Sequence, residues 1–166
     1  MTSIRSRIPE LWIAAAIVVM DQATKALVKA GLPLHESVTV IPGFFDLTHV
    51  RNTGAAFGML NNMQFAYKPA VMVVVALVAL GAVASYALTL PQTQRIARYG
   101  LALILGGAAG NLIDRATLGY VVDFVDVYWR QYHFWAFNVA DSAITIGVVI
   151  MILDMLGVRA HVSKTA

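Results

Sequence analysis

The chain has 166 residues, of which 59% are hydrophobic and 13% are charged, and its net charge is +3. Soluble domains carry about a quarter charged residues, so this composition indicates a protein embedded in lipid. Cysteine is absent, which excludes disulfides, thiol nucleophiles and thiolate metal sites. The basic residues form no dense run, so no nucleic-acid partner is expected. The length suits one integral membrane domain over residues 1–166.

The first predicted membrane helix covers residues 9–30. It is apolar from Leu11 to Met20, and Asp21, Gln22 and Lys25 follow at once. Helical periodicity continues to Val28, and Gly31 then gives a plausible end. An alternative interpretation stays open, because the basic start and the short apolar run also fit a secretory signal peptide.

Three further helices are predicted over residues 70–90, 96–113 and 140–158. The first of these has 21 residues without a charge, and about 20 are needed to cross the hydrocarbon core. Asp114 and Arg115 follow the end of the helix at residues 96–113, and Asp141 lies in the first turn of the helix at residues 140–158. The sequence therefore predicts an all-α membrane fold, a bundle of four transmembrane helices with both termini on one side.

Two connections lie on the opposite side of this bundle. Residues 32–67 contain the turn signal Pro42-Gly43 between short strand-like runs, which predicts a small extramembrane β element between the first two helices. Residues 119–137 hold half of the chain's aromatic side chains, and we expect them to form a loop at the membrane interface. Arg5 and Arg7 favour a cytoplasmic N-terminus, which places both connections outside.

Polar residues converge on the outer ends of the predicted helices. Charged groups at membrane depth are costly, and each requires a functional or structural explanation. The residues concerned are Asp21, Lys25, Asn111, Asp114, Arg115, Asp123, Asn138 and Asp141.

Asp123 and Asp141 are the candidate catalytic pair. Two neighbouring carboxylates can share one proton, so that one activates water and the other protonates the leaving group. The helix dipole favours charge on Asp141, which leaves the shared proton more often on Asp123. Structural roles stay open beside this one: Asn138 and Asp141 have capping-box spacing, and Asp123 fits a solvated loop acid.

The other polar residues have two interpretations each. Asn111 and Arg115 share a helix face and can hold a substrate carbonyl or fix the carboxylates; alternatively Arg115 pairs with Asp114. Asp21 and Lys25, four residues apart, favour a structural ion pair.

Small and turn-forming residues also allow a structural interpretation. Asn52 and Gly54 fit a tight turn as well as a substrate contact. Gly106 and Gly110 indicate close helix packing. A metal held by Asp123, Asp126 and His133 is the weakest interpretation, because the histidines show no ligand spacing, so neither a metal nor a cofactor is expected.

Taken together, five motifs resemble those of the lipoprotein signal peptidase family, also called signal peptidase II. They are DQATK at residues 21–25, NTGAAF at 52–57, GGAAGNLIDR at 106–115, GYVVDF at 119–124 and FNVADS at 137–142. They occur in the family's order with suitable spacing over nearly the whole chain, and no motif position departs from the family's pattern.

This resemblance implies a bacterial inner-membrane aspartyl endopeptidase with both termini in the cytoplasm and its active site at the periplasmic face. The implied substrates are diacylglyceryl-modified prolipoproteins, cleaved before the lipidated cysteine, and globomycin-type cyclic peptides are the implied inhibitors. Membrane lipids are the surroundings, and one chain is expected to hold a complete site as a monomer. The implied roles are catalytic for Asp123 and Asp141, substrate-binding for Asn52, Gly54, Asn111, Arg115 and Asn138, and pocket support for Asp21 and Lys25.

Two other functions compete with the peptidase. Intramembrane acids can relay protons in a small proton-coupled membrane carrier, although carriers place such groups near the bilayer midplane. A non-catalytic assembly factor is the third possibility, and the density of polar motifs argues against it.

Overall fold

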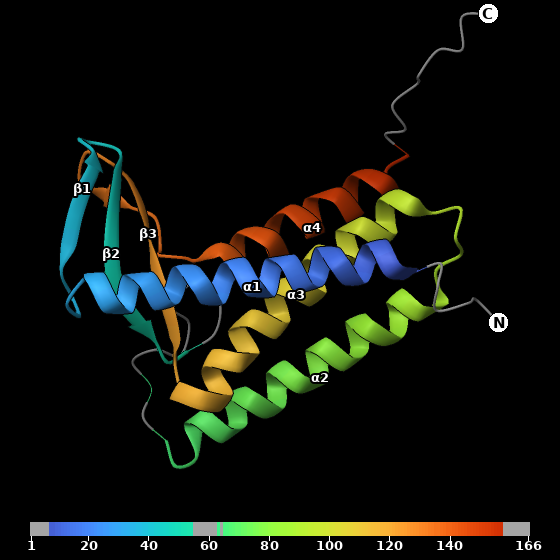
Figure 1. The fold of residues 1–166 in the computed structure, drawn as a ribbon, viewed down its shortest axis with the longest axis horizontal. Helices are drawn as coiled ribbons and strands as arrows, with labels where there is room; N and C mark the ends of the chain where they lie inside the picture. Colours follow the sequence, from blue (N-terminus) through green and yellow to red (C-terminus); the bar gives the residue numbers. More distant parts are fainter. Residues whose placement is uncertain (1–6, 55–62, 64, 158–166) are drawn as a thin grey trace, which may run out of the picture.

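A computed structural model describes residues 7–54, 63 and 65–157 of the chain. Its four helices run alternately in opposite directions, and α3 packs against the three others (Figure 1). A small antiparallel sheet lies at one end of the bundle, at the left of Figure 1. The helices are α1 (Ile8–Gly31), α2 (Lys68–Thr89), α3 (Arg95–Leu118) and α4 (Val139–Met155).

Local sequence explains where the helices begin and end. Proline lies in the first turn of both α1 and α2, where its missing N–H costs no hydrogen bond. Gly119 ends α3 with a φ of 80°, a left-handed conformation that glycine adopts readily. The end predicted at residue 113 is five residues too early, because the charge of Asp114 is buried and paired and does not stop the helix.

Three of the described helices, α1, α2 and α3, are long and apolar enough to cross a membrane. The chain is thus a helical membrane protein, and these three predicted spans are confirmed. Large apolar side chains of α2, such as Val74 and Val78, are exposed in the isolated chain, as expected for a surface that faces lipid. The fourth helix, α4, has 17 residues; the predicted end at residue 158 lies outside the described residues.

Glycines allow α3 to approach its neighbours closely. A Cβ on Gly106 would come within 2.8 Å of the carbonyl oxygen of Ala14 on α1. A Cβ on Gly110 would likewise come within 2.6 Å of Oδ2 of Asp21 on α1, so both glycines confirm the packing role predicted for the GxxxG spacing. Towards α4, Gly100 faces Gly147, where a Cβ on Gly147 would come within 2.5 Å of the Gly100 carbonyl oxygen.

The sheet combines both outer connections. Strands β1 (Ser37–Ile41) and β2 (Phe45–Asn52) confirm the predicted strands between α1 and α2. The expected loop at residues 119–137 is wrong in part, since β3 (Val121–Trp129) and β4 (Tyr132–His133) lie there. The order is β1-β2-β3-β4, all antiparallel. Residues 121–128 are valine and aromatic residues with only two acids, a composition that favours a strand. The prediction of an interfacial loop gave too little weight to this preference.

Candidate active site

The candidate carboxylates come from two elements that meet at the C-terminal end of α3. Asp123 lies in β3 and is only 2% exposed. Asp141 lies in the first turn of α4 and is half-buried. The pairing of β3 with β2 fixes the position of Asp123, which lies opposite Val50 in the sheet. The start of α4 fixes the position of Asp141.

Asn138 joins the two carboxylates directly. Its side-chain amide donates to Oδ1 of Asp123 at 2.6 Å, and its backbone N–H donates to Oδ2 of Asp141 at 3.3 Å. Its own Oδ1 accepts from the backbone N–H of Asp141 at 2.9 Å. These contacts confirm the predicted capping box, and they show that one residue caps α4 and also holds Asp123.

Two further asparagines occupy the other carboxylate oxygens. Asn111 of α3 donates to Oδ1 of Asp141 at 2.8 Å. Asn52, at the end of β2, donates to Oδ2 of Asp123 at 3.1 Å. Asn52 pairs with Val121, so its side chain is a diagonal neighbour of Asp123 on the sheet. Every oxygen of the two carboxylates therefore accepts a hydrogen bond from an asparagine side chain or backbone.

The electrostatics of the site favour the protonated form of Asp123. Burial, followed by the nearby charge of Asp141, raises the pKa of Asp123 to about 7, although the hydrogen bonds from Asn52 and Asn138 oppose this shift. A carboxyl group with this pKa can hold a proton near neutral pH and release it during a reaction. The interpretation of Asp123 as a solvated loop acid is wrong, because the side chain is buried.

Arg115 and Gly54 lie beside the pair. Arg115 donates to the carbonyl oxygens of Gly54 at 3.1 Å and Asn111 at 3.3 Å. The backbone N–H of Gly54 donates to Oδ1 of Asn52 at 3.0 Å, which forms the tight turn that the sequence allowed. Arg115 thereby ties the turn after β2 to α3. The later residues of the NTGAAF motif, 55–57, lie outside the described residues.

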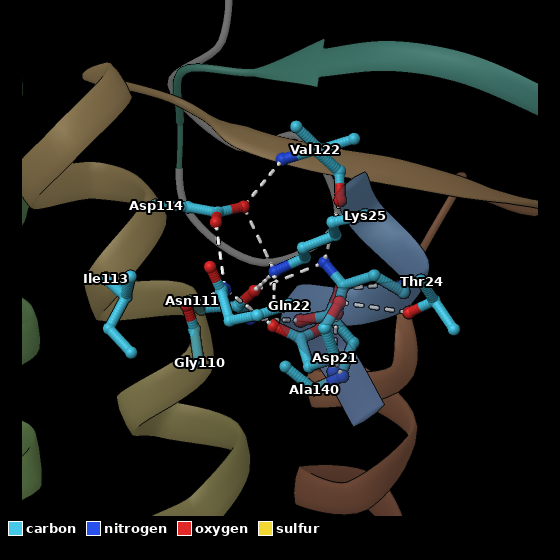
Figure 2. Close-up of polar contacts among 12 residues, drawn as sticks. Asp21, Gln22, Thr24, Lys25, Gly110, Asn111, Ile113, Asp114, Val122 and Ala140 are labelled. Carbon is cyan, nitrogen blue, oxygen red and sulfur yellow. Dashed lines mark hydrogen bonds and ion pairs between the residues drawn. The ribbon is translucent and has the colours of Figure 1, made fainter. Parts of the chain in front are cut away.

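A buried ionic cluster of α1 and α3 side chains adjoins the site through Asn111 (Figure 2). Lys25 forms ion pairs with Asp21 at 2.8 Å and with Asp114 at 3.1 Å, and it donates to Oδ1 of Asn111 at 2.9 Å. Lys25 is 1% exposed and Asp21 is fully buried. The predicted Asp21–Lys25 pair is confirmed. The alternative interpretation, in which Arg115 pairs with Asp114, is not what the structure shows, because the ion pair of Asp114 is with Lys25.

The structure brings all nine predicted site residues into one neighbourhood and adds two members that had no predicted site role. Asp114 was counted among the converging polar residues but received no site role, and Gln22 was not singled out. Gln22 donates to Asp114 at 3.0 Å and to the carbonyl oxygen of Gly110 at 3.2 Å. The spacing of residues 111, 114 and 115 along α3 could have drawn attention to Asp114, because side chains three and four apart are neighbours on a helix surface.

The metal interpretation finds no support in the described residues, where no group of three or more acidic or histidine side chains is arranged to hold an ion. His133 instead contacts Asp126 at 2.8 Å, and the oxygens of Asp123 accept from asparagines. The chemistry that this geometry supports is proton transfer between two carboxylates.

A helical membrane protein with two electrostatically coupled carboxylates, one buried and one half-buried, has the construction of a membrane aspartic peptidase. The family model described as Signal peptidase (SPase) II, peptidase family A8, matches residues 13–157. The chain belongs to the signal peptidase II family.

Relatives with the same family name match over most of their length. The lipoprotein signal peptidase of Geobacter metallireducens is 49% identical over 152 residues, which cover 92% of this chain and 93% of that protein. The lipoprotein signal peptidase of Desulforapulum autotrophicum is 50% identical over 145 residues, covering 87% and 89% respectively.

A solved structure described as a bacterial membrane enzyme, determined by the in meso method at 2.3 Å resolution, is also similar. It aligns with a TM-score of 0.79 at 31% identity, over 95% of this chain and 93% of that one. A second structure with the same description, at 1.9 Å resolution, gives a TM-score of 0.78 at 33% identity and covers 89% and 92%. Because the chain belongs to this family, its function is that of a peptidase and not that of a proton-coupled carrier or an assembly factor.

Proposed function

We propose that this protein, a lipoprotein signal peptidase, cleaves diacylglyceryl-modified prolipoproteins immediately before the lipidated cysteine, with Asp123 and Asp141 as its catalytic pair. The observation that supports the assignment of the pair is that Asn138 donates a hydrogen bond to each of the two carboxylates. Because one residue holds both groups, Asp123 through its side chain and Asp141 through its backbone N–H, they lie close enough for a single water molecule to meet both. Family membership supports the reaction, and the geometry supports the residues.

The charge distribution suggests how the two carboxylates divide the work. Asp123 carries the shared proton near neutral pH, in agreement with its raised pKa. Ionised Asp141 takes a proton from water while the water oxygen bonds to the carbonyl carbon of the scissile peptide. Asp123 hydrogen-bonds the developing oxyanion. The C–N bond then breaks as Asp123 gives its proton to the leaving amine, and the proton that Asp141 took from water remains as the one proton shared by the pair.

The neighbouring polar residues would bind and orient the peptide. Arg115 and Asn111 are the candidates for holding a substrate carbonyl, because both have N–H donors at the rim of the carboxylate pair. The turn at Asn52 and Gly54 would contact the peptide backbone from the opposite side. Asn138 would keep Asp123 oriented, and Asp21 and Lys25 would support the pocket from behind.

The position of the site suits a substrate anchored by lipid. The carboxylates lie where α3 ends and α4 begins, next to the sheet, so a scissile bond held near the membrane surface could reach both them and water. We infer that α4 is a fourth membrane span, because it runs beside α3 and exposes large apolar side chains such as Ile152. Residues 1–166 would then form one integral membrane domain, with the sheet at the membrane surface.

This arrangement implies a location in the bacterial cytoplasmic membrane. An even number of spans leaves both termini on one side of the membrane, and Arg5 and Arg7 favour the cytoplasm for that side, so the active site would lie at the periplasmic face. Because all the site residues come from one chain, a monomer would suffice. Membrane lipids would surround the helices, and globomycin-type cyclic peptides would inhibit by occupying the substrate site. The reaction as written requires no metal or other cofactor.

The test is incubation of the purified protein with a lipidated prolipoprotein and with the same precursor lacking the lipid. We expect mass spectrometry to identify a product that begins at the lipidated cysteine, and little cleavage of the unmodified precursor. A chelator should leave the rate unchanged. Cleavage at another position, or equal cleavage of both precursors, would contradict the proposed specificity.

A further inference from the structure

Two acids outside the proposed catalytic pair hold the backbone next to it. The N–H of Val122, one residue before Asp123, donates to Oδ2 of Asp114 at 3.1 Å. The N–H of Ala140, one residue before Asp141, donates to Oδ1 of Asp21 at 3.0 Å. Each candidate catalytic residue is thus preceded by an amide bound to a buried carboxylate.

A single ammonium group connects these two anchoring carboxylates. Nζ of Lys25 lies 2.8 Å from Asp21 and 3.1 Å from Asp114, and its third donor contact is to Asn111 at 2.9 Å (Figure 2). An ammonium has three N–H donors, so all of them are engaged. Because Asn111 also donates to Asp141, the cluster reaches the pair through a side chain as well as through two backbone amides.

The cluster is placed to control geometry. Asp21, Lys25 and Asp114 are at most 2% exposed, so their charge-assisted hydrogen bonds form in a region of low dielectric constant, where such bonds are strong and directional. Asp123 and Asp141 belong to a strand and a helix that are separate elements. A link between their backbones is therefore a direct means of fixing their separation, and a misplacement of about 1 Å can cost about 100-fold in rate.

We propose, on the basis of the function above, that Asp114 is a positioning residue. With Asp21 and Lys25 it forms a three-residue clamp that sets the distance between the Asp123 and Asp141 carboxylates through the amides of the preceding residues. The clamp acts on the catalytic pair from behind and contacts neither the substrate nor the attacking water. Its contribution is to the chemical step and not to substrate binding.

The first test compares Asp114→Ala with Asp114→Asn. The alanine variant removes the acceptor for the Val122 amide, whereas the asparagine side chain keeps an oxygen that can accept it. We expect kcat per folded enzyme to fall at least tenfold in Asp114→Ala, with KM within about threefold of the wild type. Asp114→Asn should recover at least about a third of the wild-type kcat. Unchanged kcat in the alanine variant, or equal losses in both variants, would overturn the proposal.

The second test moves the clamp without removing any polar group. A Cβ on Gly110 would lie 2.6 Å from Oδ2 of Asp21, so Gly110→Ala must displace that carboxylate. Gly81→Ala in α2 is the control, because nothing lies within 4 Å of a Cβ placed there. We expect kcat to fall at least tenfold in Gly110→Ala and to stay within about threefold in Gly81→Ala. This comparison decides the matter if Asp114→Ala does not fold; equal kcat values in the two glycine variants would overturn the clamp.

The catalytic proposal can fail separately from the clamp. Asp123→Asn and Asp141→Asn are assayed alongside, with the same lipidated precursor. Full activity in either of them would refute the assignment of the catalytic pair. Loss of activity in both, together with wild-type kcat in Asp114→Ala and Gly110→Ala, would refute the clamp alone.

Discussion

Asn138 offers a way to separate the stability of α4 from the geometry of the catalytic pair. Its Oδ1 caps the helix by accepting from Asp141, and its Nδ2 donates to Asp123 at 2.6 Å and to Asn111 at 3.1 Å. Asn138→Ala removes both functions. Asn138→Ser keeps a good capping oxygen, but its side chain is too short to reach Asp123.

The structure sets the expected size of each effect. Loss of the cap costs about 1 kcal/mol, and buried acceptors left without a donor cost about 1–3 kcal/mol. Asn138→Ala should therefore lower the free energy of unfolding by about 2–4 kcal/mol, and Asn138→Ser by about 1 kcal/mol less. Because Asp123 holds a proton near neutral pH, its hydrogen bond from Asn138 contributes about 0.5–1.5 kcal/mol, so both variants should lose about 2- to 13-fold in kcat.

The assay combines unfolding in detergent with kcat for a lipidated precursor at constant pH. The reasoning predicts that the serine variant recovers stability without recovering activity. If Asn138→Ser regained wild-type kcat, the contact of Asn138 with Asp123 would have no catalytic importance. If its unfolding matched that of Asn138→Ala, the cap would contribute nothing.

Three further predictions concern protonation, the buried lysine and the neighbouring strand. Because burial raises the pKa of Asp123 to about 7, cleavage should decline as pH rises above that value; a pH–rate profile that stays flat to pH 9 would contradict its role as the acid. The folded state binds this proton more tightly than the unfolded state, so the contribution of Asp123 to stability should fall as pH rises from about 4 to 7. The measurement is the difference in free energy of unfolding between the wild type and Asp123→Asn across this pH range. Lys25→Met should lower the free energy of unfolding by about 3–5 kcal/mol, because two buried carboxylates lose their cation; denaturation in detergent checks this, and a small loss would contradict it. Asn52→Ala should lower kcat by about tenfold with little change in stability, since Asn52 is half-buried and its amide holds Asp123; unchanged kcat would show that the contact is dispensable.

The sequence predicted the helices and the gathering of polar residues well, because both follow from the cost of placing charge in lipid. A residue such as Asp141 in the first turn of an apolar helix needs a structural or functional reason to be there. Capping-box spacing then identified Asn138 from local rules alone. These inferences depend on neighbours within one helix, which a sequence shows directly.

The strand pairing and the wider cluster could not be obtained in this way. The run from Val121 to Trp129 has strand composition, but its partner β2 lies about 70 residues earlier, and no local pattern specifies a pairing across that distance. Asp114 was interpreted as the end of a helix because the ammonium of Lys25 that compensates its charge comes from α1. Long-range compensation of charge is visible only once the helices are packed.

The measurement that tests the central claim most directly is a double-mutant comparison of the catalytic pair. Asp123→Asn, Asp141→Asn and the variant with both changes are assayed for kcat/KM on one lipidated precursor, with deamidation excluded by mass spectrometry. Two groups that act as one unit give strongly non-additive losses, so the double variant should be about as inactive as either single variant. Losses that multiply would show that the two carboxylates act independently, and substantial cleavage by the double variant would place the catalytic groups elsewhere in the protein.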